Sequence, residues 1–279
     1  MQQIIECVPN FSEGHNQETI DQIVAAIKAV PQVEVLDQTK DPDHNRCVIT
    51  FVGPPPAVVE AAFKATEAAA SLINLKQHQG VHPRVGATDV IPLIPLQGIT
   101  TQELIPYSEI LAQRITQELH IPTYLYEHSA KNPEKQNLAN IRNKSLIPDF
   151  IPENPHATAG KTVVGVRDIL IAFNVNLKST DLAAAKRIAA KVRHSSGGRP
   201  QLKALGLRLN DCVQVSMNLT DYRITSPLQA YQAVAAEAAT LGIQIRESEL
   251  IGLIPQDALP ENPETTIKLP HYKILPTRL

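Results

Sequence analysis

The chain has 279 residues, of which 43% are hydrophobic and 19% are charged, and its formal net charge is −2. This length exceeds what one small hydrophobic core usually serves, so we expect two domains. A near-neutral chain has no overall field that attracts nucleic acid, and a sequence without tryptophan offers few aromatic residues for stacking on bases. The composition therefore predicts an ordinary globular protein and disfavours nucleic-acid binding.

The cysteines and the N-terminus indicate the cellular compartment. Cys7, Cys47 and Cys212 are widely spaced, which fits reduced thiols better than a disulfide framework. The N-terminus has no basic segment followed by a long apolar run, and no stretch approaches the roughly 20 apolar residues of a membrane span. We expect a cytoplasmic protein without a membrane partner.

The first half of the chain predicts strands and helices in the order β-α-β-β-α-β. Apolar, β-prone runs indicate strands at residues 3–8, 33–36, 47–52 and 90–94. Apolar residues at helical spacing indicate helices at residues 20–27 and 58–73. A polar loop is expected at 37–46, and a helix at about 101–119 and a strand at 122–126 are appended. This order is that of a split βαβ, or ferredoxin-like, unit.

A polar connection at residues 130–165, helical only at 136–141, precedes a second series of elements. Strands are predicted at 168–177, 203–209, 212–219 and 243–254. One helix is predicted to begin with Ser179 or Thr180 as its N-cap and to end near Gly197, and another to occupy residues 227–241. The order β-α-β-β-α-β thus occurs twice. Four prolines from Pro260 onward predict an extended or loosely docked tail.

The stretch most informative about function is VHPRVGATDV at residues 81–90, which leads into a strand. Pro83 disfavours a helical conformation of the preceding residue, so His82 is expected to be extended in a turn. His82, Arg84 and Asp89 are predicted to cluster where a loop enters a sheet, a frequent position for catalytic residues. The alternative is a surface turn with an incidental histidine.

Other polar segments are expected to face a cleft between the two sheets, because ligands favour domain interfaces. They include the turns at residues 10–14 and 41–46. Asn174 and Asn176 lie in an otherwise apolar strand, where an amide is costly to bury unless it is hydrogen-bonded. These two asparagines either bond neighbouring loops or contact a polar ring of a ligand.

Several segments resemble the formiminotransferase family and occur in the family's order between residues 3 and 259. They are ECVPNFSEG at 6–14, DPDHNR at 41–46, TFVG at 50–53, HPRVGATDVIP at 82–92, YLYE at 124–127, IAFNVNL at 171–177, QVSMNL at 214–219 and ELIGLIP at 249–255. The better known members of this family transfer a formimino group from formiminoglutamate to tetrahydrofolate in histidine breakdown.

The resemblance implies an α+β fold of two ferredoxin-like βαββαβ subdomains with a folate-binding tunnel between their sheets, and a homodimer. The subdomains would occupy residues 1–165, including the connecting loop, and 166–259, followed by a tail at 260–279. The family's catalytic histidine falls on His82. Its folate-contacting segment falls on Ile151, Pro152, Glu153, Asn154, Pro155, His156, Ala157, Thr158, Ala159 and Gly160.

The residues fit this chemistry. When a nitrogen of reduced folate attacks an amidine carbon, the nucleophile loses a proton and the leaving amine gains one, so one histidine serves both steps. Both substrates carry carboxylates, which pair well with guanidinium groups. Asp43 and His44 either orient His82, bind the pterin, or only stabilise their own turn. The expected substrate-binding residues are Asn10, Ser12, Asp43, His44, Arg46, Arg84, Asp89, Arg167, Asn174 and Asn176.

Tetrahydrofolate is the expected co-substrate, and no metal is expected. His78 and His82 are four residues apart, but Gly80 and Pro83 disfavour the helix that would place both on one face. The chain departs from the family pattern in the connection at 141–150, which is shorter, and at Ile151, where a glycine is usual. Three alternatives therefore stay open: formyl transfer, another amino-acid donor, and a non-catalytic folate-binding or partner-binding role.

Overall fold

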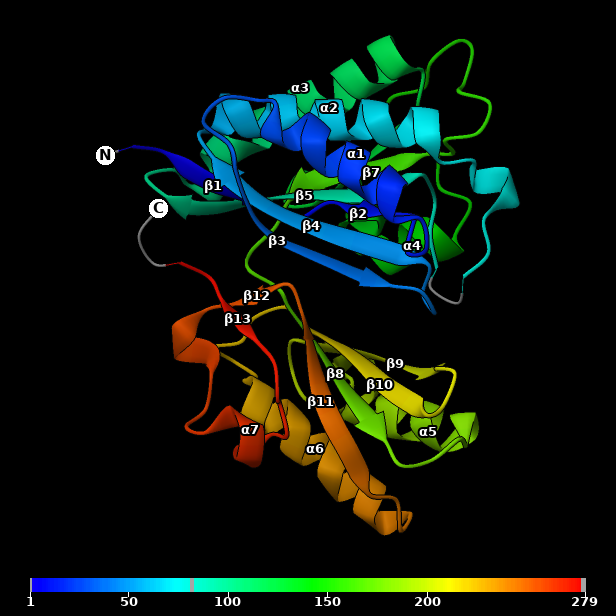
Figure 1. Ribbon diagram of the computed structural model, residues 1–279, viewed down its shortest axis with the longest axis vertical. Coiled ribbons are helices and arrows are strands. Elements are labelled where there is room, and N and C mark those ends of the chain that lie inside the picture. The colour runs from blue at the N-terminus through cyan, green and yellow to red at the C-terminus, as the bar shows by residue number, and fades with distance from the viewer. Residues whose placement is uncertain (1, 81–82, 277–279) are drawn as a thin grey trace. The chain divides into compact units, whose positions relative to one another are not determined.

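The computed structural model describes residues 2–80 and 83–276, and the chain divides into two compact units. Unit 1 comprises residues 1–168 and unit 2 comprises residues 169–279. Both combine helices with β-sheets, which agrees with the predicted α+β class (Figure 1). No helix among the described residues is long and apolar enough to cross a membrane.

Unit 1 is built on one mixed sheet, which has seven strands among its described residues. They are β1 (Ile4–Cys7), β2 (Asn10–Phe11), β3 (Glu34–Asp41), β4 (Arg46–Gly53), β5 (Thr88–Gln97), β6 (Thr123–Glu127) and β7 (Thr162–Val166). β1 and β2 both lie between β4 and β5 and pair antiparallel with each, because Pro9 interrupts what is otherwise one strand. β3 extends the sheet beyond β4, while β7 and then β6 extend it in parallel beyond β5.

The α-helices of unit 1 are α1 (Gln17–Lys28), α2 (Pro55–Leu72), α3 (Thr101–Leu119) and α4 (Leu138–Asn143), with short 3-10 helices η1 (Leu75–Gln77) and η2 (Pro133–Gln136). The side chain of Asn16 caps α1 by accepting a hydrogen bond from the Thr19 N–H. The stripe of Ile20, Ile23 and Ile27 on α1 is fully buried, as the helical spacing predicts.

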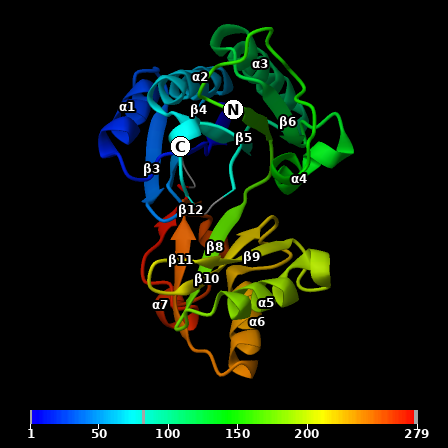
Figure 2. The same cartoon turned by 90° about the vertical axis from the view of Figure 1, so that its right-hand side faces the viewer.

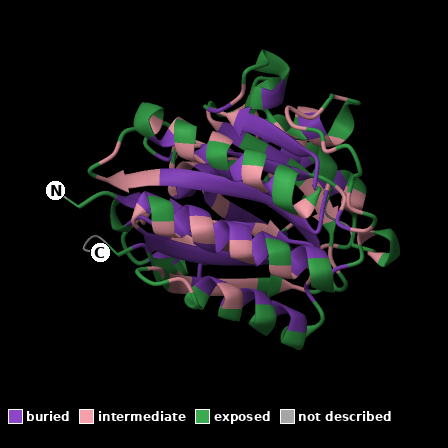
Figure 3. Cartoon of the chain, turned by 90° about the horizontal axis from the view of Figure 1, so that it is seen from above, coloured by how far each residue is buried: buried purple, intermediate pink, exposed green. Residues whose placement is uncertain are grey.

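The helices α1, α2 and α3 lie on one face of the sheet and enclose the main core of this unit (Figures 1 and 2). Alternate strand residues point into this core, among them Ile5 and Cys7 of β1. Figure 3 shows the strands buried along most of their length beneath helices with exposed outer surfaces. On the opposite face, Ile141 of α4 packs with Val90 and Tyr124 in a smaller cluster.

Unit 2 contains a four-stranded antiparallel sheet in the spatial order β11 (Ile245–Ile251), β8 (Ile171–Leu177), β10 (Val213–Leu219) and β9 (Leu202–Arg208). The helices α5 (Leu182–Val192) and α6 (Pro227–Thr240) lie on one face of this sheet (Figure 2). Phe173, Val175 and Leu177 of β8 point into the core between the sheet and these helices.

The C-terminal part of unit 2 is packed more closely than its proline content predicts. It contains β12 (Leu253–Ile254), η4 (Gln256–Ala258), α7 (Pro263–Thr266) and β13 (Lys273–Ile274), and β12 pairs in parallel with β13. Ile267 and Leu269 are fully buried in the core of unit 2. These two apolar side chains dock a segment that we expected to be extended or loosely docked.

Two expectations about the first half differ from the structure. The segment at 37–46, expected to be a loop, is a strand as far as Asp41, because β3 pairs with β4 through Asp41 and Arg46. Only the turn at 42–45 is irregular, and Asn45 adopts a positive φ of 46° there. The connection at 130–165 ends in β7, which the sequence did not predict as a strand.

Two further differences occur in the second half. The N-cap of α5 is Asp181, which accepts hydrogen bonds from the N–H groups of Ala183 and Ala184, rather than Ser179 or Thr180. An aspartate accepts such bonds well and also favours the positive end of the helix dipole. The strand expected at 243–254 is divided into β11 and β12 at Gly252, whose φ is 81°.

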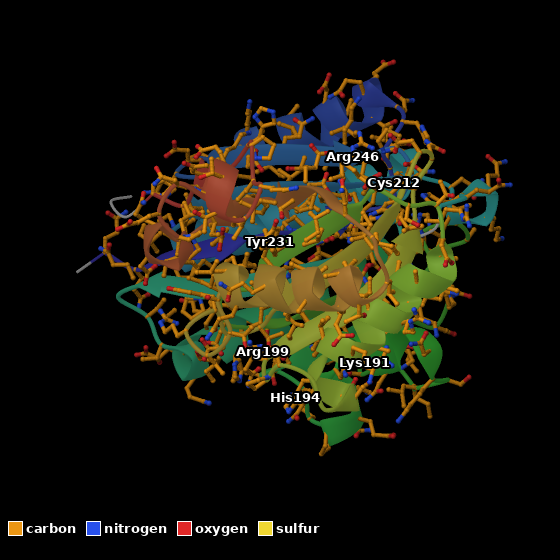
Figure 4. All side chains as sticks on the ribbon, turned by 90° about the horizontal axis from the view of Figure 1, so that it is seen from below. Lys191, His194, Arg199, Cys212, Tyr231 and Arg246 are labelled. Carbon is orange, nitrogen blue, oxygen red and sulfur yellow. The ribbon has the colours of Figure 1, made fainter. Side chains whose placement is uncertain are left out.

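All three cysteines are free and buried. Burial raises the pKa of Cys47 to about 12, and it also raises the pKa of Cys7 and of Cys212. Cys212 lies near Arg246 (Figure 4), which forms an exposed ion pair of 2.6 Å with Asp211. A thiol with a raised pKa is a poor nucleophile at neutral pH, so none of the three is a candidate catalytic residue.

A short 3-10 helix, η3 (His194–Ser196), follows α5 in unit 2.

Candidate active site

Loops that follow β2 and β3 and precede β5 meet at one end of the unit 1 sheet. The Ser12 hydroxyl donates a hydrogen bond of 2.7 Å to the carbonyl oxygen of Gly86. The Gly14 N–H donates one of 2.8 Å to Oδ1 of Asn45. A Cβ atom at Gly14 would lie only 2.4 Å from the carbonyl oxygen of Asp41, so this approach requires glycine. The loops are therefore joined by specific bonds rather than by proximity alone.

The guanidinium of Arg84 binds the turn between β3 and β4. Its Nη1 donates to the carbonyl oxygen of Asn45 at 2.9 Å, and its Nη2 donates to that of His44 at 2.8 Å. Nη1 also lies 2.6 Å from Nε2 of His78. The same Nε2 lies 3.0 Å from the carbonyl oxygen of Asn45. Burial, and then the charge of Arg84, lower the pKa of His78. These contacts fix the side chain of Arg84 on this turn.

Asp89 is a buried carboxylate among three arginines. It is 1% exposed, its Oδ1 accepts a hydrogen bond of 2.7 Å from the Val85 N–H, and its Oδ2 forms an ion pair with Nη2 of Arg142. Burial lowers the pKa of Arg46 to about 10, and among the neighbouring charges Asp89 opposes this effect most. Burial also lowers the pKa of Arg84, and the charge of Asp89 opposes this effect. A further carboxylate, from a ligand, suits this arginine cluster.

His44 lies in the turn that Arg84 binds, and it is 2% exposed. Its Nδ1 is 3.2 Å from Oδ2 of Asp41, and its backbone N–H donates to Oδ1 of Asp41 at 2.9 Å. Burial lowers the pKa of His44, while the charge of Asp41 opposes this. Asp43 is partly buried in the same turn. The geometry is that of a turn stabilised by its own aspartate, and a direct contact of Asp43 or His44 with a ligand stays a prediction.

The remaining predicted residues of unit 1 are dispersed. Asn10 lies in β2, and its Nδ2 donates to the carbonyl oxygen of Val8 at 3.1 Å. Arg167 follows β7 and donates from Nη1 to the carbonyl oxygen of Asp168 at 2.8 Å. His82 lies outside the described residues, so its expected place in an extended turn stays a prediction.

The segment at 151–160, predicted to contact folate, adjoins the loop that precedes β5. The Leu75 N–H donates to the carbonyl oxygen of Thr158 at 2.9 Å, and the Ala87 N–H donates to that of Ala159 at 2.8 Å. Gly160, with a φ of 72°, forms a β-bridge with Gly86. The structure therefore brings the C-terminal end of this segment next to Gly86 and Ala87, which directly precede β5. The exposed residues of the segment are Ile151, Glu153, Asn154, Pro155 and Ala157.

In unit 2, the amides of Asn174 and Asn176 are hydrogen-bonded within the sheet. Nδ2 of Asn174 donates to Oε2 of Glu249 at 3.0 Å. Nε2 of Gln214 donates to Oδ1 of Asn176 at 3.0 Å and to Oε2 of Glu249 at 3.1 Å. These bonds supply the partners that buried amides need. Gln214, 1% exposed, retains a buried Oε1 without a partner among the described residues.

Both units are similar to known proteins. Residues 4–167 match the N-terminal subdomain of the formiminotransferase domain, and residues 172–275 match the formiminotransferase domain. The chain belongs to the formiminotransferase family. It is 43% identical to the glutamate formimidoyltransferase of Streptococcus pyogenes serotype M1, over 93% of this chain and 91% of that protein. It is also 43% identical to the enzyme of that name from Thermoplasma acidophilum, over 92% and 89% of the two chains.

A longer relative is also similar to this formiminotransferase-family chain. The formimidoyltransferase-cyclodeaminase of Rattus norvegicus is 40% identical, over 93% of this chain but only 51% of the rat protein. The similarity therefore concerns about half of that bifunctional relative.

Three polar residues that the sequence did not single out lie beside the predicted ones in this family member. Arg142 lies in α4, where the sequence shows only a weak helical pattern. Gln214 and Glu249 are the first residues of two segments that carry the family resemblance, QVSMNL and ELIGLIP. Their place in these segments is the signal that could have identified them. Within residues 2–80 and 83–276, no three His, Cys, Asp or Glu side chains converge as metal ligands.

Proposed function

We propose that this chain is a glutamate formimidoyltransferase, which transfers a formimino group from N-formimino-L-glutamate to tetrahydrofolate. The observation that carries this proposal is the extent of the family match, over residues 4–167 and 172–275. Two proteins named glutamate formimidoyltransferase align with 93% and 92% of the chain. A match of this extent covers both units, so it supports the whole activity rather than one binding module.

In the proposed reaction, a nitrogen of tetrahydrofolate attacks the amidine carbon of the donor and forms a tetrahedral intermediate. The attacking nitrogen loses one proton, the bond from this carbon to the glutamate nitrogen breaks, and the leaving amine gains one proton. We assign both proton transfers to His82, because an imidazole titrates near neutral pH and can act first as base and then as acid. The position of His82 in the chain supports this assignment, since it is two residues from Arg84, which bonds the turn at His44 and Asn45.

The arginine cluster around Asp89 suits the donor's carboxylates. We assign their binding to Arg46, Arg84 and Arg142, because guanidinium groups pair well with carboxylates. Asp89 then keeps the three guanidinium groups together, through its ion pair with Arg142. Ser12 holds the loop through Gly86, and Asn10, Asp43 and His44 belong to the adjoining turns that would contact the substrates.

We further propose that each unit contains a ferredoxin-like subdomain and that folate binds in a tunnel between their two sheets. The strand orders β3-β4-β1-β5 in unit 1 and β9-β10-β8-β11 in unit 2 support this, since each follows the chain order β-α-β-β-α-β. In this proposal residues 151–160, with Asn174 and Asn176, contact folate. Subdomain limits at 165 and 259, a homodimer and a cytoplasmic location belong to the same proposal.

Single-turnover mixing of the purified protein with tetrahydrofolate and N-formimino-L-glutamate tests the activity. Absorbance should show formimino-folate formed by the wild type and not by His82→Ala, while His15→Ala, at an exposed position in the same unit, should keep the rate. Equal rates for wild type and His82→Ala would contradict the role of His82. Tetrahydrofolate binding without product would favour another donor, formyl transfer or a non-catalytic role.

A further inference from the structure

A second polar cluster lies on the unit 1 sheet, apart from the arginines around Asp89. Its members are Glu6 of β1, Tyr126 of β6 and Arg167, which directly follows β7. Each is next in sequence to a strand residue of the core under α1, α2 and α3. Because neighbouring strand residues face opposite sides of a sheet, all three side chains lie on the face away from these helices.

The strand register brings Glu6 and Arg167 to opposite sides of β5, at the same position along this strand. Glu6 pairs with Ile94, and the N–H of Arg167 donates to the carbonyl oxygen of Leu93 at 3.1 Å. Glu6 is 6% exposed, and burial raises its pKa to about 7 although the charge of Arg167 lowers it. The two groups therefore interact across Ile94.

The arginine is supported from the other side by Tyr126. Tyr126 pairs with Gly165, and a Cβ atom there would lie 2.6 Å from Cδ1 of the tyrosine ring, so the ring lies over the glycine. Burial raises the pKa of the Tyr126 phenol, and the neighbouring Arg167 opposes this effect. Arg167 also bonds the carbonyl oxygen of Asp168, but it forms no direct ion pair with any described carboxylate. A guanidinium has five donors, so several stay available to a ligand.

We propose that Arg167, positioned between Glu6 and Tyr126, binds a carboxylate of the glutamate tail of the reduced folate. This inference rests on the proposed function and names the part of the co-substrate that this cluster recognises. A guanidinium fork pairs with a carboxylate through two parallel hydrogen bonds, and partial burial strengthens them.

Distance along β5 favours the folate tail over the amino-acid donor. From Asp89 to Ile94 the strand covers five residues, or about 17 Å at about 3.3 Å per residue. The donor is small, and its carboxylates must stay near the reacting carbon, where the cluster around Asp89 is available. The aminobenzoyl ring of folate, in contrast, places its carboxylates on the order of 10 Å from the reacting nitrogen by ordinary bond lengths. The reach of an arginine side chain, about 6 Å on the same basis, covers the rest.

Glu6 has a separate effect in this arrangement. When it is ionised, it repels a carboxylate bound at Arg167 and competes for the guanidinium. When it is neutral, its carboxyl group can donate a hydrogen bond to the ligand. Glu6 therefore weakens tail binding in its charged form, and glutamine at this position should relieve that effect.

The decisive experiment compares two ligands on Arg167→Gln by anaerobic titration calorimetry. Tetrahydrofolate carries the glutamate tail and tetrahydropteroate lacks it. We expect Arg167→Gln to weaken the binding of tetrahydrofolate by about 10- to 100-fold, which is the effect of losing a charge-assisted pair. The affinity for tetrahydropteroate should be unchanged. Unchanged tetrahydropteroate binding also shows that the variant is folded. Equal losses for both ligands, or no loss for either, would overturn the proposal.

Two further variants sharpen the result. Arg199→Gln, at an exposed position of unit 2 (Figure 4), is the matched control and should bind both ligands as the wild type does. At pH 8, Glu6→Gln should bind tetrahydrofolate several-fold more tightly than the wild type and tetrahydropteroate equally well. Weaker binding of tetrahydrofolate would contradict the placement of its carboxylate at Arg167. If the wild type transfers the formimino group and Arg167→Gln binds tetrahydrofolate with full affinity, only this inference is refuted. Wild type that does not bind tetrahydrofolate refutes both this inference and the proposed function.

Discussion

At the scale of single residues, unit 1 compensates buried charge in two ways. Around Asp89, the charges of three arginines surround one carboxylate, and the charge of Asp89 opposes the burial that lowers the pKa of Arg46 to about 10. At Glu6, one guanidinium acts on a carboxyl group from across a strand, and burial still raises its pKa to about 7. In the first arrangement, opposite charges compensate one another. The second contains a group that titrates within the physiological range.

The pKa of Glu6 predicts a pH dependence of stability. In the folded chain the carboxyl group of Glu6 has a pKa of about 7, whereas in the unfolded chain its pKa has the usual value of 4.5. Between these values the folded chain binds more protons, so the free energy of unfolding falls as pH rises, by about 3 kcal/mol in all, and this contribution levels off above the folded pKa. Urea unfolding between pH 4.5 and 8 should show this slope in wild type, relative to Glu6→Gln. Glu34→Gln, at an exposed position of β3, should keep it, and parallel curves for wild type and Glu6→Gln would contradict the assignment.

The sequence indicated some partners in the candidate site better than others. Arg84 and Asp89 lie near each other in the chain, and Pro83 and Gly86 mark the loop between helix and strand that carries them. Arg142 is 53 residues from its partner Asp89, so no local pattern could connect them. The polar asparagines of β8 were visible as exceptions in an apolar strand, but their partner Glu249 lies on β11, and only the strand pairing brings it close.

At the scale of elements, local signals located the long helices well. α1, α3 and α6 have apolar stripes together with a capping side chain at the first turn, and two of them carry a capping box. β7 was missed because it is five residues long, contains Gly165 and ends a long irregular connection. Its partners β5 and β6 pair with it in parallel, and parallel pairing depends on distant segments rather than on a local turn.

The N-cap of α5 provides a test in which the structure and the sequence-based expectation differ. Asp181 accepts hydrogen bonds of 2.8 Å and 3.2 Å from the N–H groups of Ala183 and Ala184. Asp181→Ala should therefore lower the free energy of unfolding by about 1 kcal/mol, measured by urea denaturation. Thr180→Ala is the matched control, since the sequence alone allowed Thr180 to be the cap, and it should have no measurable effect. A larger loss for Thr180→Ala than for Asp181→Ala would reverse the assignment.

At the scale of the whole molecule, length predicted two domains, and the chain divides into two units with separate hydrophobic cores. What length and proline content did not predict is the role of the C-terminal segment. Ile267 and Leu269 join the core of unit 2, and Ser248 of β11 donates from Oγ to the carbonyl oxygen of Ile267 at 2.6 Å. Two apolar residues among prolines form no periodic pattern, so their burial depends on tertiary packing alone.

Separate cores predict that each unit folds without the other. Fragments 1–168 and 169–279 should each unfold cooperatively in urea, because each keeps its own sheet, helices and buried apolar side chains. A fragment that unfolds without a cooperative transition would show that its core needs the other unit.

The same fragments test the proposed tunnel, because a ligand enclosed by two sheets loses part of its contacts when either is removed. Each fragment alone should bind tetrahydrofolate at least about tenfold more weakly than the whole chain, since each lost charge-assisted contact is worth about that factor. Fragment 1–168 contains the cluster around Asp89 and also Arg167, so it is the more stringent case. Full affinity in that fragment would place the entire folate site on unit 1. Loss of affinity in a fragment that is shown to be folded requires contacts from unit 2, and the polar side chains of β8, β10 and β11 are then the ones to substitute first.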